Sequence, residues 1–297
     1  MVYSENGLHL RCETRGIAVY LDNFAFIELA LYKPALGKRF IGAIRSGADV
    51  LFSVTNLVEL GELQGNSLEK MRSFLADIGN HWFPVELNAL EIVQREKDGW
   101  GEKSFVSQQF IKDYFAFKTQ QIQDRASSLV VVPGAQAFSL EGVLDWATPQ
   151  RDSLKKGKAQ MDAALKKLVQ ESRKRHEQDP NWLDTRFPML PFDRSFRGSF
   201  VCGRLLRCLI LEAKKHPLKR NDGMDLSHAV VAAGFSSAGT LDADWKRRIE
   251  SIPGPHQLAP IYTSAQLDDF VLQTERSVEL WRHAQEPRII WTPRVYT

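Results

Sequence analysis

Short apolar runs that are each followed by a helical pattern constrain the fold of this chain more than any other feature. Residues 17–21 (IAVYL) are β-branched and aromatic enough to predict a buried strand, and they end directly on Asp22. Residues 24–31 (FAFIELAL) then predict a buried helix that ends before Pro34. The first unit is therefore a strand, an acid at its end and a helix.

A second unit of the same kind follows. Residues 50–54 (VLFSV) predict another strand, and Thr55 is expected to N-cap a helix that carries Glu59 near its first turn. Apolar residues then recur at helical spacing from Leu68 to Ile78, which predicts an amphipathic helix. The N-terminal part of the chain is therefore typical of an α/β fold.

Longer helical patterns interrupt this alternation in the middle of the chain. They predict a mainly helical insertion at residues 84–199, between an N-terminal half-domain at 1–83 and a C-terminal half at 200–270. Residues 271–297 are expected to form a C-terminal tail. Within the insertion, residues 129–133 (LVVVP) are compatible with a strand or a loop.

The α/β pattern resumes after the insertion. Residues 200–215 predict a helix, and Asp225 is expected to open an alanine-rich helix, DLSHAVVAAGF. Residues 237–241 predict a strand that ends on Asp242, and residues 259–263 (APIYT) predict the last strand. Strands that alternate with helices imply a mostly parallel sheet, whose active groups gather beyond the carboxyl ends of the strands.

Composition narrows the class of protein without naming a function. Apolar residues make up 43% of the 297 residues, which is typical of a globular protein. The net charge of +3 is too small to argue for nucleic-acid binding, and three cysteines without a CxxC pair argue against a disulfide framework or a zinc ribbon. The absence of a signal-peptide pattern and of an apolar run of 18 residues predicts a cytoplasmic protein with no membrane partner.

Four segments resemble the motifs of PIN-domain nucleases, and they occur in the family's order. They are YLDNFAFIEL, TNLVELGEL, DLSHAVVAAG and TLDADW, followed by APIYTSAQLDDF, which resembles the family's final strand and helix. The resemblance covers roughly residues 17–80 and 200–270. It implies a PIN-like three-layer sandwich with a mostly parallel central sheet, to which the helical insertion is added.

The resemblance also implies a set of site residues and a chemistry. Asp22, Glu59, Asp225 and Asp242 match the family's catalytic, metal-binding carboxylates, and Asn23, Thr240 and Asp244 match its supporting positions. The implied activity is Mg²⁺- or Mn²⁺-dependent hydrolysis of RNA. Some members are toxins that an inhibitory protein neutralises, so an inhibitory partner is among the implied partners, as is a homo-oligomer. The large insertion, however, departs from the compact toxin members of the family.

The chemistry of carboxylates explains why such a set needs a cation. Several carboxylates in one place raise one another's pKa unless a cation compensates their charge, and Mg²⁺ and Mn²⁺ prefer oxygen ligands. Glu62 is an alternative to Glu59 in this set, and Asp222 and Asp244 are alternative ligands that flank the motif. His228, three residues after Asp225, is expected to make a local structural hydrogen bond rather than to act in catalysis.

Basic residues are candidates for contact with nucleic-acid phosphates. Residues 151–175 hold nine Lys or Arg against three acids. This stretch is either the solvated face of an amphipathic helix or a phosphate-binding arm. The candidate nucleic-acid-binding residues are Lys246, Arg247 and Arg248, just after TLDADW, and Lys155, Lys156 and Lys158 in the basic stretch.

These features together predict a metal-dependent endoribonuclease. Two alternatives remain open on the sequence. The first is a catalytically weak PIN-like RNA-binding or regulatory subunit, and the second is a structure-specific DNA nuclease.

Overall fold

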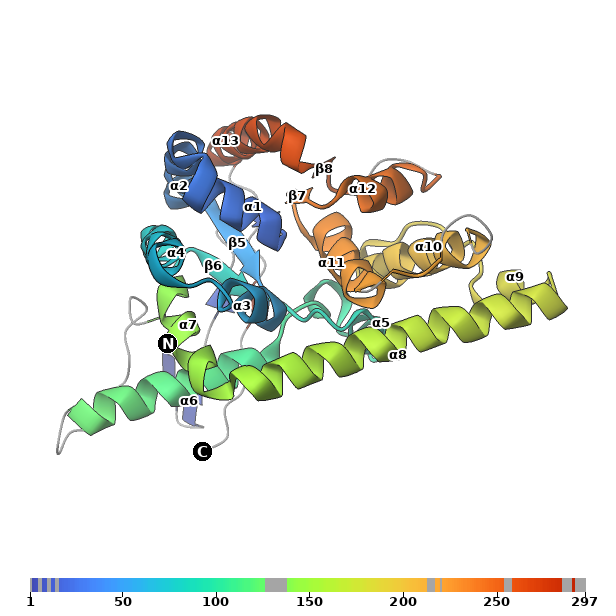
Figure 1. The fold of residues 1–297 in the computed structure, drawn as a ribbon, viewed down its shortest axis with the longest axis horizontal. Coiled ribbons are helices and arrows are strands. Elements are labelled where there is room, and N and C mark those ends of the chain that lie inside the picture. The colour runs from blue at the N-terminus through green and yellow to red at the C-terminus, as the bar shows by residue number, and fades with distance from the viewer. Residues whose placement is uncertain are drawn as a thin grey trace.

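Five parallel strands form the central sheet of the part of the chain that the structure describes (Figure 1). The computed structural model describes residues 16–125, 138–212, 217–219, 221–253 and 258–284, and the backbone of short strands near both ends of the chain. The strand order across the sheet is β6(Trp82–Pro84), β5(Ala48–Phe52), β4(Ile17–Tyr20), β7(Ala238–Thr240) and β8(Ile261–Tyr262). The predicted α/β class and parallel sheet are confirmed.

The direction in which the strands are added reverses at β4. The chain adds β5 and then β6 on one side of β4, and later adds β7 and β8 on the other side. Such a reversal is a topological switch point, and in open parallel sheets ligands bind beyond the carboxyl ends of the strands at this point. Here the switch point lies between β4 and β7.

Helices cover both faces of the sheet because side chains alternate along each strand. Val19 and Phe52 point to one face and join one apolar core, whereas Tyr20 and Leu51 point to the other face and join a second core. The first core is packed by helices α1(Asn23–Ile27), η1(Glu28–Tyr32), α2(Pro34–Gly47), α3(Val54–Leu60), α4(Gly65–Ile78) and α13(Leu267–Ala284). The second is packed by α5(Ala89–Lys97), α10(Arg197–Leu211), α11(Asp222–Phe235) and α12(Ala243–Glu250).

The predicted insertion is mainly helical and completes the same two cores. Its further helices are α6(Gln108–Arg125), α7(Leu140–Ala147), α8(Arg151–Gln178) and α9(Trp182–Arg186). Leu140 and Val143 of α7 belong to the first core, and Leu165 and Val169 of α8 belong to the second. The long helix α8 runs along one side of the molecule, past α3, α11 and α10 (Figure 1). The segment 129–133 lies outside the described residues.

The structure also contains several short elements. They are the 3₁₀ turns η2(Gly101–Lys103), η4(Thr148–Gln150), η5(Arg194–Phe196) and η6(Ser264–Gln266), and the paired strands β1(Val2–Ser4) with β2(Gly7–His9) and β3(Cys12–Glu13) with β9(Ile290–Trp291). No helix within the described ranges is long and apolar enough to cross a lipid bilayer.

Three predicted boundaries are wrong. The second strand starts at Ala48 and Ser53 caps the following helix, so Thr55 lies inside the helix, because the Ser53 hydroxyl accepts the N–H of the third helical residue. Asp225 does not open its helix, which starts one turn earlier, after Asn221 with a positive φ of 76°. The predicted tail begins inside α13, whose buried Val278 packs in the first core.

Helix α2 and strand β6 were not predicted from the sequence. Helix α2 begins at Pro34, a favoured first position, and buries Phe40 and Ile44 four residues apart. Strand β6 has only three residues, Trp82–Pro84, and its pairing with β5 defines it.

Glu96 of α5 is a buried carboxyl group that caps another helix. It is 1% exposed, and its oxygens accept the backbone N–H groups of Gly198 and Ser199, in the first turn of α10, at 2.7 Å each. The Ser104 hydroxyl donates a third bond at 3.3 Å. Burial raises the pKa of Glu96, although these bonds partly offset the shift.

The raised pKa of Glu96 predicts a pH-dependent stability. The folded protein holds the proton more tightly than the unfolded chain, so ionisation destabilises the fold as pH rises above the unfolded value of about 4.3. A Glu96→Gln variant cannot ionise here, so the free energy of unfolding of the wild type minus that of the variant should fall as pH rises through this window. Urea titrations of both proteins at several pH values measure it. A difference that increases with pH would contradict the burial effect.

Candidate functional site

Two aspartates lie beyond the carboxyl ends of the strands that flank the switch point. Asp22 follows β4 and caps α1, accepting the Asn23 N–H at 2.7 Å, and Asp242 follows β7 and caps α12, accepting the Trp245 N–H at 2.9 Å. The backbone N–H of Asp22 donates to Thr240 Oγ1 at 2.9 Å, which ties the ends of the two strands together. The structure therefore brings Asp22, Asp242 and the supporting Thr240 to one sheet edge.

Asp225 approaches this edge from α11, the helix that packs against β4. Burial, and then the charges of Asp22 and Asp242, raise the pKa of Asp225 to about 8. Burial also raises the pKa of Asp22, with smaller contributions from the charges of Glu59 and Asp242 and an opposing effect of His228. The four predicted acids are therefore close enough for their charges to interact.

A chain of side-chain amides positions Glu59. Asn56 Nδ2 donates to Asn23 Oδ1 at 3.0 Å, and Asn23 Nδ2 donates to Glu59 Oε2 at 2.5 Å. Asn56 is in turn held by Ser53 in a capping box at the start of α3. Asn56 was not predicted, because the usual capping-box pattern has Glu or Gln rather than Asn at this position.

The structure separates Glu59 from Glu62, the two candidates on this part of the chain. Glu59 faces Asn23 and the acidic edge, whereas Glu62 pairs with Lys155 of α8 at 2.8 Å, and this pairing lowers its pKa. The other oxygen of Glu59, Oε1, accepts a bond from Lys158. The basic helix thus contributes two lysines to ion pairs with α3 and its C-terminal turn.

His228 forms a buried pair with Tyr20 beneath the acids. The Tyr20 hydroxyl is hydrogen-bonded to His228 Nδ1, and the two rings meet edge to face with centroids 5.9 Å apart. The predicted structural role of His228 is met by a strand residue distant in sequence rather than by a local partner. Because His228 lies one turn after Asp225, this pair links the helix carrying Asp225 to β4. Burial lowers the pKa of His228, which favours the neutral ring.

Removal of the Tyr20 hydroxyl is expected to destabilise the protein. Tyr20→Phe leaves a buried ring nitrogen of His228 without its partner, which should lower the free energy of unfolding by about 1–3 kcal/mol. Urea denaturation measures the loss. Tyr32→Phe is the matched control, because Tyr32 is 70% exposed, and an equal effect of both substitutions would contradict the role of the buried pair.

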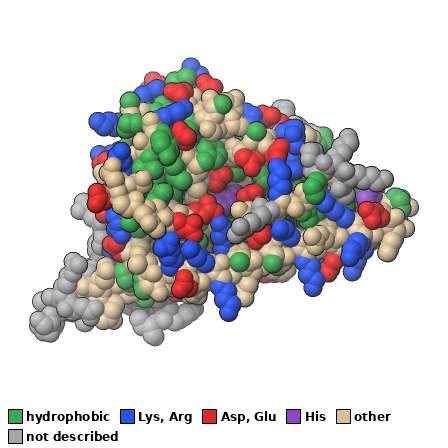
Figure 2. Space-filling view, viewed as in Figure 1, with side chains coloured by type: hydrophobic (Ala, Val, Ile, Leu, Met, Phe, Trp, Pro, Cys, Tyr) green, Lys and Arg blue, Asp and Glu red, His purple; other side chains and the backbone are tan. Residues whose placement is uncertain are grey.

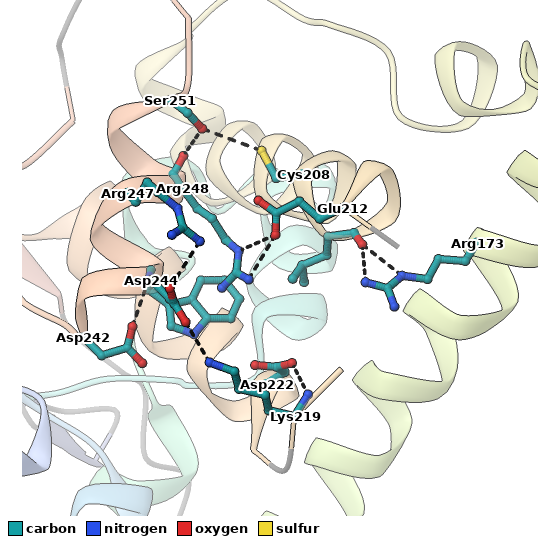
Figure 3. Close-up of polar contacts among 12 residues, drawn as sticks. Arg173, Cys208, Glu212, Lys219, Asp222, Asp242, Asp244, Arg247, Arg248 and Ser251 are labelled. Carbon is teal, nitrogen blue, oxygen red and sulfur yellow. Dashed lines mark hydrogen bonds and ion pairs between the residues drawn. The ribbon is translucent and has the colours of Figure 1, made fainter. Parts of the chain in front are cut away.

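The cations after Asp242 have different environments (Figure 3). Arg248 is 5% exposed, lies over the Trp245 ring and bonds Glu212 at 3.0 Å. Its predicted phosphate contact is therefore replaced by an internal ion pair. Lys246 donates to Gln266 Oε1 at 2.8 Å beside the end of β8, whereas the Arg247 side chain remains 56% exposed.

Asp244 faces these surface cations. It accepts from Lys219 Nζ at 2.7 Å and pairs with Arg247 at 3.2 Å, as Figure 3 shows. The bond with Lys219 lowers its pKa. In this structure Asp244 therefore neutralises cations of α12 and of the segment before α11, which is the only supporting role that its contacts show.

Helix α8 is attached closely to the start of α11. Asp162 Oδ1 accepts the N–H groups of Gly223 at 3.0 Å and Met224 at 3.3 Å, which are free donors at a helix N-terminus. A Cβ on residue 223 would lie 2.6 Å from the Asp162 carbonyl oxygen, so only glycine permits this approach. Sequence reasoning counted Asp162 only as one charge of the basic stretch.

Comparisons of the chain with protein-family models, with curated proteins and with solved structures find no match. The resemblance to PIN nucleases therefore rests on the sequence motifs alone. Figure 2 shows acidic side chains in the middle of the face on which α1, α3 and α11 meet, with basic side chains beside them over the start of α8.

The acidic residues fit a hard divalent cation by their chemistry but do not form a closed group. All four are oxygen donors. Burial is the main cause of the raised pKa values of Asp22 and Asp225, and the charges of the neighbouring acids add to it. Among the described residues, no three His, Cys, Asp or Glu side chains converge closely enough to hold a metal ion. Helix N–H groups bind one oxygen each of Asp22 and Asp242, and Lys158 binds Glu59.

Proposed function

We propose that this protein is a PIN-like, Mg²⁺- or Mn²⁺-dependent endoribonuclease. The observation that carries the proposal is the position of Asp22 and Asp242 after the two strands that flank the switch point, the place where α/β sheets bind ligands. The charges of Asp225 and Glu59 act on the same place. The order of the motifs along the chain agrees with this assignment.

The roles of the residues follow from their contacts. Asp22, Asp225 and Asp242 would hold the cation, with Glu59 as a further donor. A divalent cation bound there would activate a water molecule and stabilise the leaving oxygen of a phosphodiester. Asn23 orients Glu59 through its amide. Thr240 holds the backbone of Asp22 against β7.

RNA as substrate is supported by the family resemblance and by exposed cations. Arg247 lies in the helix that Asp242 caps, and Lys156 lies in α8. Both side chains are exposed to solvent, although Arg247 also pairs with Asp244 at 3.2 Å. Lys155 and Lys158 form ion pairs with glutamates and are weaker candidates for that contact.

A second candidate function is a catalytically weak RNA-binding or regulatory subunit. The pairing of Glu59 with Lys158 favours this second function, because the ion pair occupies one of the carboxylate oxygens that a metal ion would need. The two functions differ in turnover, so a cleavage assay separates them.

The test is incubation of the purified protein with labelled RNA and with DNA of the same sequence, in Mn²⁺, Mg²⁺ or EDTA. Cleavage of RNA that EDTA abolishes supports the proposal. RNA binding without cleavage in either metal supports the regulatory subunit, and selective cleavage of DNA supports a DNA nuclease and contradicts the proposal.

A further inference from the structure

Helix α8 places a positive charge inside the acidic site. The Lys158 ammonium group binds Glu59 Oε1, and its side chain is only 16% exposed, compared with 38% for that of Glu59. The charge of Lys158 also acts on the buried His228, beneath the acids, where it disfavours the protonated ring. Lys158 is therefore a partly buried cation beside the acids rather than part of a fully solvated helix face.

The docking of α8 holds this charge in place. Lys155 binds Glu62 on the segment that follows α3, and Asp162 caps α11 on the other side of Lys158. These contacts lie three residues before and four residues after Lys158, so they share one face of the helix. Gly223 permits the close approach of the two helix backbones. Lys158 is thus anchored from both sides.

A cation at this position competes with another cation. Glu59 Oε1 cannot bind a lysine ammonium and a divalent ion in full at the same time, and two positive charges a few ångströms apart repel each other. Both effects lower the affinity of the acids for a metal ion.

We propose that α8 regulates this site, with Lys158 acting as a tethered cation that competes with Mg²⁺ or Mn²⁺ for Glu59. The inference rests on the proposed function, because it presupposes a divalent ion at the acids. The helical insertion thereby sets the metal concentration at which the site fills.

Mn²⁺ binding, measured by electron paramagnetic resonance of the free ion, tests the inference without any activity assay. Lys158→Met is expected to lower the Kd for Mn²⁺ about tenfold, because it removes the competing charge and frees Glu59. Lys155→Met is the matched control: it removes the same charge from the same helix face but frees Glu62. Its Kd should stay within about twofold of the wild type.

A double substitution identifies the route of the effect. Adding Glu59→Gln to Lys158→Met should remove most of the gain, because the gain depends on the freed carboxylate. Lys158→Arg, which keeps the charge, should bind Mn²⁺ like the wild type. Lys158→Gln repeats the test with a polar side chain if the Met variant folds poorly, and circular dichroism verifies the fold of each protein.

The outcomes separate this inference from the proposed function. Mn²⁺ binding that Asp225→Asn abolishes, with equal affinity in Lys158→Met and Lys155→Met, overturns the inference and leaves the metal site standing. Weaker binding by Lys158→Met overturns it as well. Absence of Mn²⁺ binding in both the wild type and Lys158→Met overturns both proposals, whereas binding only in Lys158→Met supports both.

Discussion

Asp22→Asn, Asp225→Asn and Asp242→Asn are each expected to lower metal-dependent RNA cleavage by more than about a hundredfold. Each substitution replaces a charged oxygen donor by a neutral amide at the acidic edge, and loss even of residues that only support metal ligands typically costs 10- to 100-fold. Initial rates on labelled RNA in saturating Mn²⁺ measure the effect. Full activity in any of the three variants would remove that residue from the site.

The choice of asparagine separates metal binding from helix capping. Asp22 and Asp242 each accept a helix N–H, and asparagine caps helices as well as aspartate does. Both variants should therefore keep the melting temperature of the wild type within a few degrees. Asp193→Asn is the matched control, because Asp193 is an exposed capping aspartate at η5 and accepts the Ser195 N–H at 2.7 Å. Equal loss of cleavage in that control would contradict a specific role of the acidic edge.

Glu96→Ala is expected to lower the free energy of unfolding by about 2–4 kcal/mol. The substitution leaves the N–H groups of Gly198 and Ser199 buried without their acceptor, removes the partner of Ser104 and opens a cavity between α5 and α10. Such a loss is a large part of the stability of a typical domain. Urea denaturation monitored by circular dichroism measures it.

Two further variants, Glu96→Gln and Glu91→Ala, serve as comparisons for Glu96→Ala. Glu96→Gln keeps the shape and one acceptor, so it should cost less than half as much at neutral pH. Glu91→Ala removes an exposed glutamate of the same helix that pairs with Arg95, and it should cost less than about 1 kcal/mol. If Glu96→Ala were as mild as Glu91→Ala, the buried cap would not contribute to stability.

The positions of Asp22 and Asp242 at the ends of strands were predicted from the sequence segments that directly precede them. Asp22 directly follows the apolar run 17–21, and Asp242 directly follows residues 237–241 (SAGTL). Both segments form strands in the central sheet. The limits of the second strand and of the helix around Asp225 differ from the prediction by two or three residues. The Ser53 cap decides the first, and the positive φ of Asn221 marks the start of the second. The register within α11 matters most here: it places Asp225 inside the helix rather than at its N-cap.

By itself the sequence determined the α/β class, the parallel sheet and the strand-end positions of Asp22 and Asp242, because hydrophobic periodicity and the side chain at a strand end are local properties. Tertiary structure alone decided that β4 lies beside β7, that Glu59 rather than Glu62 faces the acids, that Arg248 is buried and that Lys158 binds Glu59. These outcomes depend on contacts between segments far apart in the chain. Charge patterning along one helix cannot distinguish a lysine in solvent from one held against an acid 99 residues away.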